Sequence, residues 1–337
     1  MMTTPPAAFS PRFRLKWLSA LVSALVSAFA SGLLLAAAVS AQDKPPLKIV
    51  TGFPPGGSVD ILARIVADAV RDDFSNVVVE NKPGAAGRIA LNQVKQAKPD
   101  GQTVIILPMG PMVLFPHTFK KLDYDGFKDF TPVSQLALSN FALVAGPSSG
   151  VGSVSEMLAK VKANPSLGNY GSSGLGTLPH FIGVMMEQST GVPLNHVPFQ
   201  GGAPANTALL GGHIQYNIDV VSEAIPLHRD GKVKILAVLG AERDPLLPNV
   251  QTIKEQGVNF ESSVWFAMYA PAALAPDVLA RLEKAVSAAI RKPDVREKLS
   301  RLGYVPTGTN SRELASIHRA DFARWEKPIK ATGISLD

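Results

Sequence analysis

Residues 48–70 read KIVTGFPPGGSVDILARIVADAV, a short apolar strand followed by a Pro-Pro-Gly-Gly turn and an amphipathic helix. Gly56 and Gly57 let the backbone of the turn approach a ligand closely, and Ser58 can cap the helix. The N–H groups of the first helical turn then point at whatever lies in front of them, which suits an anion. The same residues are equally typical of a tight turn without a ligand. The junction therefore predicts an α/β protein with one candidate anion site.

Residues 1–41 have the features of a secretory signal peptide. Three basic residues precede a largely apolar run over 18–39, and the segment ends in the small residues Val39-Ser40-Ala41. Serine and glycine dilute the apolar run, so cleavage after Ala41 is favoured over retention as a membrane anchor. We therefore expect export to a bacterial periplasm. A lipid anchor on the mature N-terminus would need a cysteine, and the chain contains none.

Length and charge narrow the possible classes of protein. Removal of 41 of the 337 residues leaves 296, enough for two lobes of ordinary domain size. The leader carries three of the 33 Lys and Arg residues and none of the 27 Asp and Glu residues, so the net charge of the mature chain is +3. No basic run with interleaved aromatic residues indicates a nucleic-acid partner. The lack of cysteine excludes disulfides, thiolate metal sites and a catalytic thiol.

Strands and helices alternate after the leader, which predicts parallel sheets covered by helices. Apolar runs predict strands over 76–80, 103–107, 141–145, 195–198, 214–220, 233–239 and 264–270. Helical spacing and caps predict helices over 87–98, 153–163, 205–210, 224–229 and 277–290, one that carries Pro179, and a last one capped by Asn310 and Glu313. Ser153 and Glu156 are expected to form a capping box.

Two later turns repeat the chemistry of the first. Residues 169–174 (NYGSSG) and 199–204 (FQGGAP) each follow a predicted strand and open a helix. Ligands in open α/β sheets bind beyond the carboxyl ends of strands, where such turns gather. Three turns of one kind therefore favour an anion site.

The sequence offers little of the chemistry that an enzyme needs. No G-x-S-x-G elbow is present, and Gly171-Ser172-Ser173-Gly174 has the wrong spacing for a hydrolase nucleophile. The six histidines form no pair at helical metal-ligand spacing, and neither a Walker A sequence nor a complete dinucleotide fingerprint occurs. We therefore expect no catalytic residue, no metal and no cofactor. His180, just behind a glycine loop, is a candidate ligand contact.

With these elements placed, the chain resembles the Bug-type substrate-binding proteins of tripartite tricarboxylate transporters over essentially all of residues 46–337. The order and spacing of six motifs carry the resemblance: GFPPGGSVDILAR at 52–64, VVVENKPGAAG at 77–87, KPDGQTVIIL at 98–107, NYGSSGLGTLPH at 169–180, HVPFQGGAPANTALLGG at 196–212 and WFAMYAPA at 265–272.

The resemblance implies a two-lobed periplasmic-binding-protein fold of the type II kind, with the ligand cleft between the lobes. Residues 46–140 and 255–337 would form lobe 1 and residues 141–254 lobe 2, with hinges near Asn140 and Asn259. The protein would be a monomeric receptor without catalysis that passes its ligand to membrane transporter subunits. A periplasmic sensor that signals to a membrane kinase, or an exported enzyme of unknown type, are the alternatives. A transcription regulator of this fold would carry a helix-turn-helix where this chain carries its leader.

In the family, the cleft grips a ligand carboxylate between the glycine turns, partly through ordered water. The resemblance therefore implies a small-molecule carboxylate as ligand. By position it assigns the ligand contacts to Phe53, Gly56, Gly57, Ser58, Asp60, Ser172, Ser173, Thr177, Gln200, Gly201, Gly202, Ala203 and Asp219. Met109, in a proline-flanked turn, is a further candidate contact.

Three positions depart from the family's habit. Residues 108–112 read PMGPM where small polar residues are frequent, Ala208 stands where an aspartate is common, and Val220-Val221-Ser222 replaces a frequent Asn-Leu-Pro. Met109 and Met112 would offer apolar surface to the ligand and leave a second carboxylate without partners. We expect a monocarboxylate with an apolar or aromatic body to bind more tightly than citrate or a C4 dicarboxylate. The alternative is that both methionines face the core.

Overall fold

The computed structural model describes residues 44–336. The predicted signal peptide, residues 1–41, lies outside the described residues, so its cleavage and the export of the chain stay predictions. Residues Pro45–Asp337 form one compact unit. No helix within residues 44–336 is both long and apolar enough to cross a membrane.

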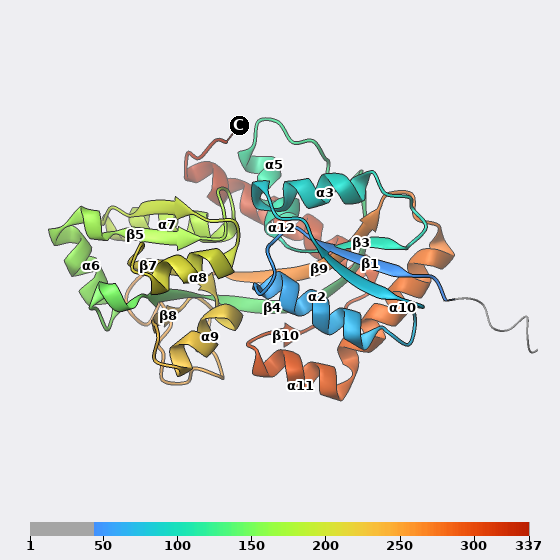
Figure 1. Cartoon of the computed structure of the whole chain (residues 1–337). Helices are drawn as coiled ribbons and strands as arrows, with labels where there is room; N and C mark the ends of the chain where they lie inside the picture. The colour runs from blue at the N-terminus through green and yellow to red at the C-terminus, as the bar shows by residue number, and fades with distance from the viewer. Residues whose placement is uncertain (1–43, 337) are drawn as a thin grey trace, which may run out of the picture. The chain divides into compact units, whose positions relative to one another are not determined.

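The first sheet contains β1 (Leu47–Thr51), β2 (Val77–Asn81), β3 (Thr103–Pro108), β9 (Ser263–Pro271), β10 (Val305–Pro306) and the first part of β4 (Phe130–Ala145). β1 lies parallel to both β2 and β3, whereas β9 is antiparallel to β3 and to β4 (Figure 1). The short β10 pairs antiparallel with β4. The apolar runs in β3 and β9 are buried on both faces, because helices cover both sides of the sheet.

The second sheet contains the last part of β4 together with β5 (Asn169–Ser172), β6 (Asn195–Pro198), β7 (Tyr216–Val220) and β8 (Lys234–Val238). β5 lies parallel to β6 and β7, and β4 is antiparallel to β7 and β8. The prediction of parallel sheets is therefore correct for the pairings among β1, β2 and β3 and among β5, β6 and β7, and wrong for the pairings that involve β4 or β9.

β4 belongs to both sheets. Residues 130–140 pair with β9, and residues 141–145 pair with β7 and β8. Figure 1 shows this strand running from one part of the fold into the other. The sequence predicted only residues 141–145. The earlier residues include Pro132, Ser134 and Gln135, and the register shifts between Pro132 and Ser134 and again beyond Gln135, so no regular alternation marks them as a strand.

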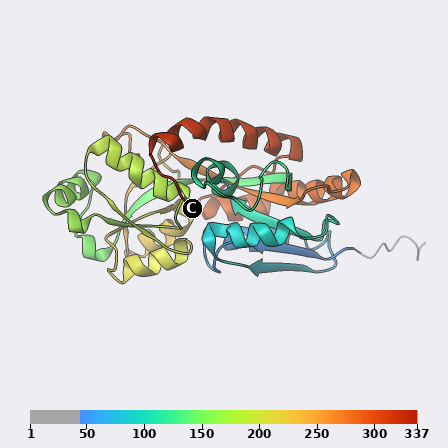
Figure 2. The ribbon, with the colours of Figure 1, turned by 90° about the horizontal axis from the view of Figure 1, so that it is seen from above.

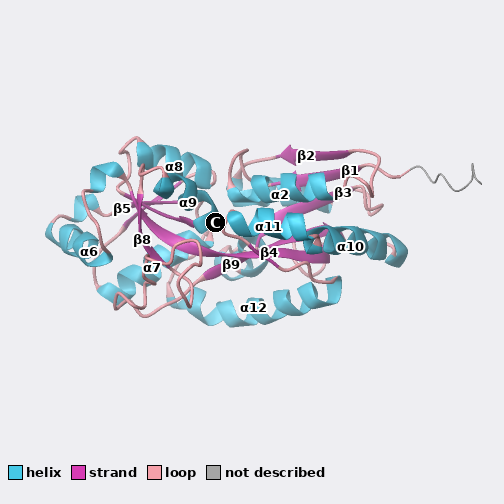
Figure 3. Ribbon diagram, turned by 90° about the horizontal axis from the view of Figure 1, so that it is seen from below, coloured by secondary structure: helices cyan, strands magenta, loops and turns pink. Residues whose placement is uncertain are grey.

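Helices cover the sheets. In Figures 2 and 3 the last helix lies along one side of β4 and β9, and the contacts confirm that it packs on β4. The helices are α2 (Ser58–Ala69), α3 (Arg88–Lys95), α4 (Gly110–Val113), α5 (Phe115–Thr118), α6 (Val154–Ala163), α7 (Leu178–Thr190), α8 (Gly202–Leu210), α9 (Val221–Arg229), α10 (Pro276–Arg291), α11 (Pro293–Arg301) and α12 (Ser311–Ala331).

Two of the three N-cap residues predicted from the sequence, Ser153 and Asn310, occupy the N-cap position of a helix. Asn310 and Glu313 form a complete capping box at α12. At α6 the Ser153 side chain accepts the Glu156 N–H, but the Glu156 carboxylate accepts the N–H of Gly152 instead of the N–H of Ser153. Ser58 is not the cap of α2: Gly57 occupies the N-cap position, without a side-chain bond.

The first prediction concerns Gly183 in α7. Alanine in mid-helix normally stabilises a protein by about 1 kcal/mol relative to glycine. A Cβ at Gly183, however, would lie 2.1 Å from Cζ of Tyr170, whose side chain is fully buried. We therefore expect Gly183→Ala to lower the free energy of unfolding by roughly 1–3 kcal/mol, measured by urea denaturation.

The matched control is Ser189→Ala, an exposed position in the same helix, which should change stability by less than about 0.5 kcal/mol. If Gly183→Ala proved as stable as the unmodified protein, the close packing of Tyr170 on α7 would be wrong.

Candidate functional site

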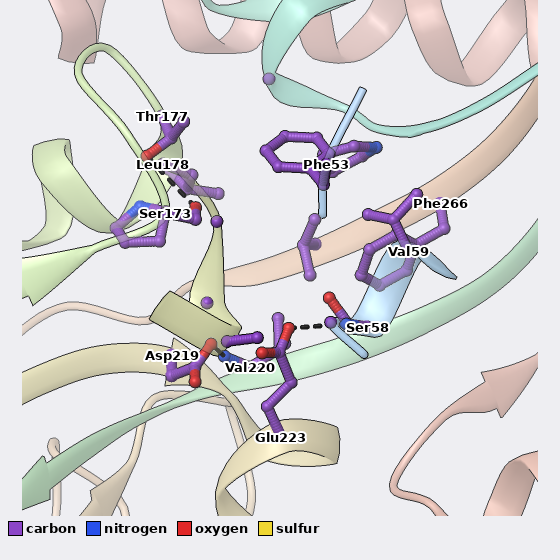
Figure 4. Close-up of a pocket in the computed structure, with 18 of the residues that line it drawn as sticks. Phe53, Ser58, Val59, Ser173, Thr177, Leu178, Asp219, Val220, Glu223 and Phe266 are labelled. Carbon is purple, nitrogen blue, oxygen red and sulfur yellow. Dashed lines mark hydrogen bonds between the residues drawn. The ribbon is translucent and has the colours of Figure 1, made fainter. Parts of the chain in front are cut away.

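A cavity lies where the turns after β1, β5 and β6 meet, as Figure 4 shows. Together with its opening it encloses about 650 Å³. Its wall is mostly apolar, with side chains that include Phe53, Val59, Phe141, Leu178, Val264 and Phe266. Among the described residues that line it, none is Lys, Arg or His. A charge on a ligand would therefore be met by backbone groups, by hydroxyls and by two carboxylates.

Among the described residues, four helices longer than one turn begin at this cavity, beside the one-turn helix α4. Ser58 opens α2, Leu178 opens α7 and Gly202 opens α8, while Val220 is the N-cap of α9. The first N–H groups of a helix have no acceptor within it, and the helix dipole places partial positive charge there. The folded chain thus concentrates hydrogen-bond donors and positive potential at one place without using a basic side chain.

Hydrogen bonds to the Asp60 side chain stabilise the turn before α2. The Asp60 carboxylate accepts the N–H of Gly56 at 3.0 Å, Nε of Arg64 at 2.9 Å and Nδ2 of Asn81 at 2.9 Å. Burial opposes ionisation of Asp60, but these hydrogen bonds and the Arg64 charge outweigh it and lower the pKa of the carboxyl. Gly56 has a φ of 86°, which favours glycine. Asp60 shapes the turn and does not line the cavity.

Asp219, at the end of β7, lines the cavity and is tied to α8. Its carboxylate accepts Nδ2 of Asn206 at 2.6 Å and the N–H of Val220 at 2.8 Å. Asn206 in turn accepts a hydrogen bond from Asn217. Burial and the nearby Glu223 carboxylate raise the pKa of Asp219. The neutral amides around Asp219 fix its position without neutralising its charge.

Glu223, which the sequence analysis did not single out, reaches across the cavity from the first turn of α9. Its Oε1 accepts the N–H of Ser58 at 2.7 Å, a bond between residues 165 positions apart (Figure 4). An ideal Cβ on Gly57 would lie 3.5 Å from Oε1, and one on Gly202 would lie 2.3 Å from Oε2. The carboxylate therefore sits between the first and third glycine turns. Burial raises the pKa of Glu223, and the hydrogen bond from Ser58 opposes that rise.

The second turn contributes hydroxyl groups. Ser173 and Thr177 line the cavity, and Thr177 Oγ1 donates to the carbonyl of Gly174 at 2.6 Å. Ser172 lies behind them, fully buried, with its hydroxyl 2.6 Å from Nε2 of His196. Its position is structural, because it also bonds both the carbonyl and the N–H of Gly174.

His180, the candidate ligand contact, lies next to His196 and helps to hold the glycine loop that follows β5. Its Nδ1 accepts the N–H of Gly176 at 3.2 Å, and its ring stacks on His196 with 4.0 Å between centroids. Burial lowers the pKa of His180 to about 4. Burial and His180 together lower the pKa of His196 to about 3. The two neutral rings brace the glycine loop, and neither lines the cavity.

The structure brings most of the predicted residues together. Nine of them line the cavity: Phe53, Gly57, Ser58, Ser173, Thr177, Gly201, Gly202, Ala203 and Asp219. Asp60, Met109 and Ser172 are buried behind the wall, whereas Gly56 is exposed in the turn outside it. Gln200 lines an adjoining hollow beside Arg88 and Phe119. Glu223 and the prolines Pro54, Pro108, Pro111 and Pro179 line the cavity and were not predicted.

Met109 and Met112 occupy the hydrophobic core. Their exposed fractions are 1% and 0%, and the lining near them comes from Pro108, Gly110 and Pro111. Because neither methionine lines the cavity, the expectation that Met109 and Met112 set the ligand preference is not supported. The apolar character expected of the cleft is present, but Phe53, Phe141 and Phe266 supply it.

Within residues 44–336, no group of three or more His, Asp or Glu side chains is arranged to hold a metal ion.

Comparison with known proteins agrees with the geometry. The model of the family described as "Tripartite tricarboxylate transporter family receptor" matches residues 62–334. Protein BugT of Bordetella pertussis is 28% identical over 318 residues, which cover 93% of this chain and 98% of BugT.

Two solved structures are similar over most of both chains. R. palustris Rpa4515 with adipate has a TM-score of 0.83 and 31% identity, and the match covers 86% of this chain and 98% of that one. MatC (Rpa3494) from Rhodopseudomonas palustris with bound malate has a TM-score of 0.80 and 31% identity, over 85% and 99% of the two chains. Family model, sequence and fold agree, and the chain belongs to the tripartite tricarboxylate transporter receptor family, with the periplasmic-binding-protein fold of its Bug relatives.

Proposed function

We propose that this protein is a periplasmic receptor that captures a small carboxylate-bearing metabolite in the cavity and delivers it to the membrane subunits of a tripartite tricarboxylate-type transporter. One observation carries the proposal: several helices begin at one apolar cavity, and none of the described residues that line it has a basic side chain. Two relatives of this fold hold adipate and malate, which are carboxylates.

Backbone donors are the groups that would hold the carboxylate. Gly202 and Ala203 open α8, and neither N–H has an acceptor among the described residues. A carboxylate placed in an apolar cavity without hydrogen bonds would be strongly disfavoured, so such donors are required. The aromatic and aliphatic wall would enclose the carbon body of the ligand, as is usual for small-molecule sites.

Absence of catalysis is part of the proposal. Ser172 and His196 resemble a nucleophile and base by distance alone. The hydroxyl of Ser172 is fully buried and engaged with Gly174, so a substrate carbonyl could not reach it. This supports a receptor over a hydrolase.

Ligand capture is proposed to close two lobes, residues 46–140 plus 255–337 and residues 141–254. The change of β4 from one sheet to the other at Asn140 and Phe141 supports a hinge there. Lining residues come from both proposed lobes: Phe53 and Phe266 from one, Ser173 and Asp219 from the other.

The glycine turns provide the most direct test. Gly57 and Gly202 have ordinary φ values, so a branched side chain there strains no backbone but fills the space beside the donors. We expect Gly57→Val and Gly202→Val each to weaken adipate binding, measured by calorimetry, by roughly tenfold or more.

Gly152→Val is the control for these variants. It lies outside the cavity, and its added side chain meets the flexible ends of Lys234 and Glu156. Normal adipate binding by either site variant would remove that turn from the site.

Closure makes a separate prediction. The radius of gyration measured by small-angle scattering should fall when a bound carboxylate brings the proposed lobes together. An unchanged radius at saturating ligand would mean that the cavity is already closed or that the lobes do not move.

The acid pair makes carboxylate binding depend on pH. Burial raises the pKa of both Asp219 and Glu223, and a third carboxylate beside them would raise these pKa values further. The bound state then takes up protons, so adipate affinity should increase as the pH falls from 8 to 6, by roughly threefold to tenfold. Glu223→Gln should flatten this dependence in calorimetric titrations. An affinity that rises with pH would contradict the assignment.

A further inference from the structure

The Glu223 carboxylate occupies a position where a ligand carboxylate would otherwise bind. It takes the Ser58 N–H at the start of α2, and its second oxygen lies beside Gly202 at the start of α8. Tyr304 holds Ser58 in place for its contact with Glu223, because the Tyr304 hydroxyl donates to the carbonyl of Ser58 at 2.8 Å. One of the anion positions of the cavity is thus filled by the chain itself.

The charges around the cavity are unbalanced. Asp219 and Glu223 are two carboxylates in one wall, and no cationic side chain lines the cavity within the described residues. Their partners are the amide of Asn206 and the N–H groups of Ser58 and Val220, which are neutral. A dicarboxylate would bring the number of carboxylates there to four, with only neutral groups among the described lining residues to offset them.

Glu223 keeps one acceptor available. Its Oε1 accepts the N–H of Ser58 and the Ser58 hydroxyl also bonds the carboxylate, which still leaves lone pairs on its two oxygens for a ligand donor. The aromatic rings of Phe53, Phe141 and Phe266 line the same cavity, and aromatic faces attract cations. A ligand N–H group would therefore meet an acceptor on this carboxylate, beside aromatic faces that also attract a positive charge.

We propose that Glu223 is a specificity-determining residue that selects a zwitterionic ligand, with one carboxylate and one ammonium group, over a dicarboxylate. The inference rests on the proposed function, since the ligand carboxylate is assigned to the N–H groups of Gly202 and Ala203. The ammonium group donates to Oε2 of Glu223 and is attracted by Asp219. The ammonium group thereby offsets one charge of the acid pair, and the zwitterion adds no net negative charge while it still uses the donors at the start of α8.

Calorimetric titration of the purified exported protein with two matched series tests this. One series is adipate, hexanoate and 6-aminohexanoate, and the other is succinate, butanoate and 4-aminobutanoate. Within each series only the terminal group changes. In at least one series we expect the aminocarboxylate to bind at least tenfold more tightly than both the dicarboxylate and the simple monocarboxylate.

Glu223→Gln keeps the shape of the side chain and its acceptor for Ser58 but removes the charge. It should lose at least tenfold in affinity for the aminocarboxylate and gain affinity for the dicarboxylate. Glu242→Gln, an exposed position with the same change in net charge, should behave as the unmodified protein. Because the comparison within the unmodified protein is itself decisive, the test does not depend on the folding of a variant.

The outcomes separate this inference from the proposed function. Adipate, succinate or a simple monocarboxylate binding at least as tightly as the aminocarboxylates would overturn the role of Glu223 and leave the carboxylate receptor intact. Equal binding of hexylamine and 6-aminohexanoate would instead show that no carboxylate is recognised, which would overturn the proposed function. Failure of every compound to bind would overturn both.

Discussion

The pairing of β4 along its full length is the constraint on which the rest of the fold depends. One strand of 16 residues supplies an edge for β9 in the first sheet and an edge for β7 and β8 in the second. The turns that end β1, β5 and β6 can face one another only because both sheets are built on this strand. Bulges along the first part of β4 add twist and bend, which are common where a strand passes between sheets.

The cavity combines two kinds of group that proteins usually keep apart. Helix starts bring positive potential, and Asp219 and Glu223 bring negative charge, in a wall that is otherwise apolar. Two effects oppose one another at Glu223. The Ser58 N–H stabilises the ionised carboxylate, whereas burial favours the protonated form. The net charge that the cavity prefers in its ligand therefore depends on the protonation of this acid pair and not on any lysine or arginine.

Local patterns account for what the sequence could predict. The strand-turn-helix junctions were recognisable because glycine, proline and apolar periodicity act within a few residues. These junctions pointed to Gly57 and Gly202, whereas Asp219 was assigned only through the family resemblance. The first part of β4 and helix α11 (Pro293–Arg301) were missed, since bulges interrupt the alternation and only one residue separates α11 from α10. Glu223 was missed because an acid in a first helical turn is ordinary. Only the tertiary fold brings it to Ser58.

The main-chain origin of the donors at Ser58, Gly202 and Ala203 has an evolutionary consequence. A substitution can alter the walls around a ligand but cannot delete a backbone N–H unless it introduces proline. The anchoring end of such a site is therefore robust to mutation, while the side chains opposite it are free to vary. A receptor built in this way can acquire a new ligand through one substitution in the first turn of a neighbouring helix, while the backbone N–H groups that bind the carboxylate stay unchanged.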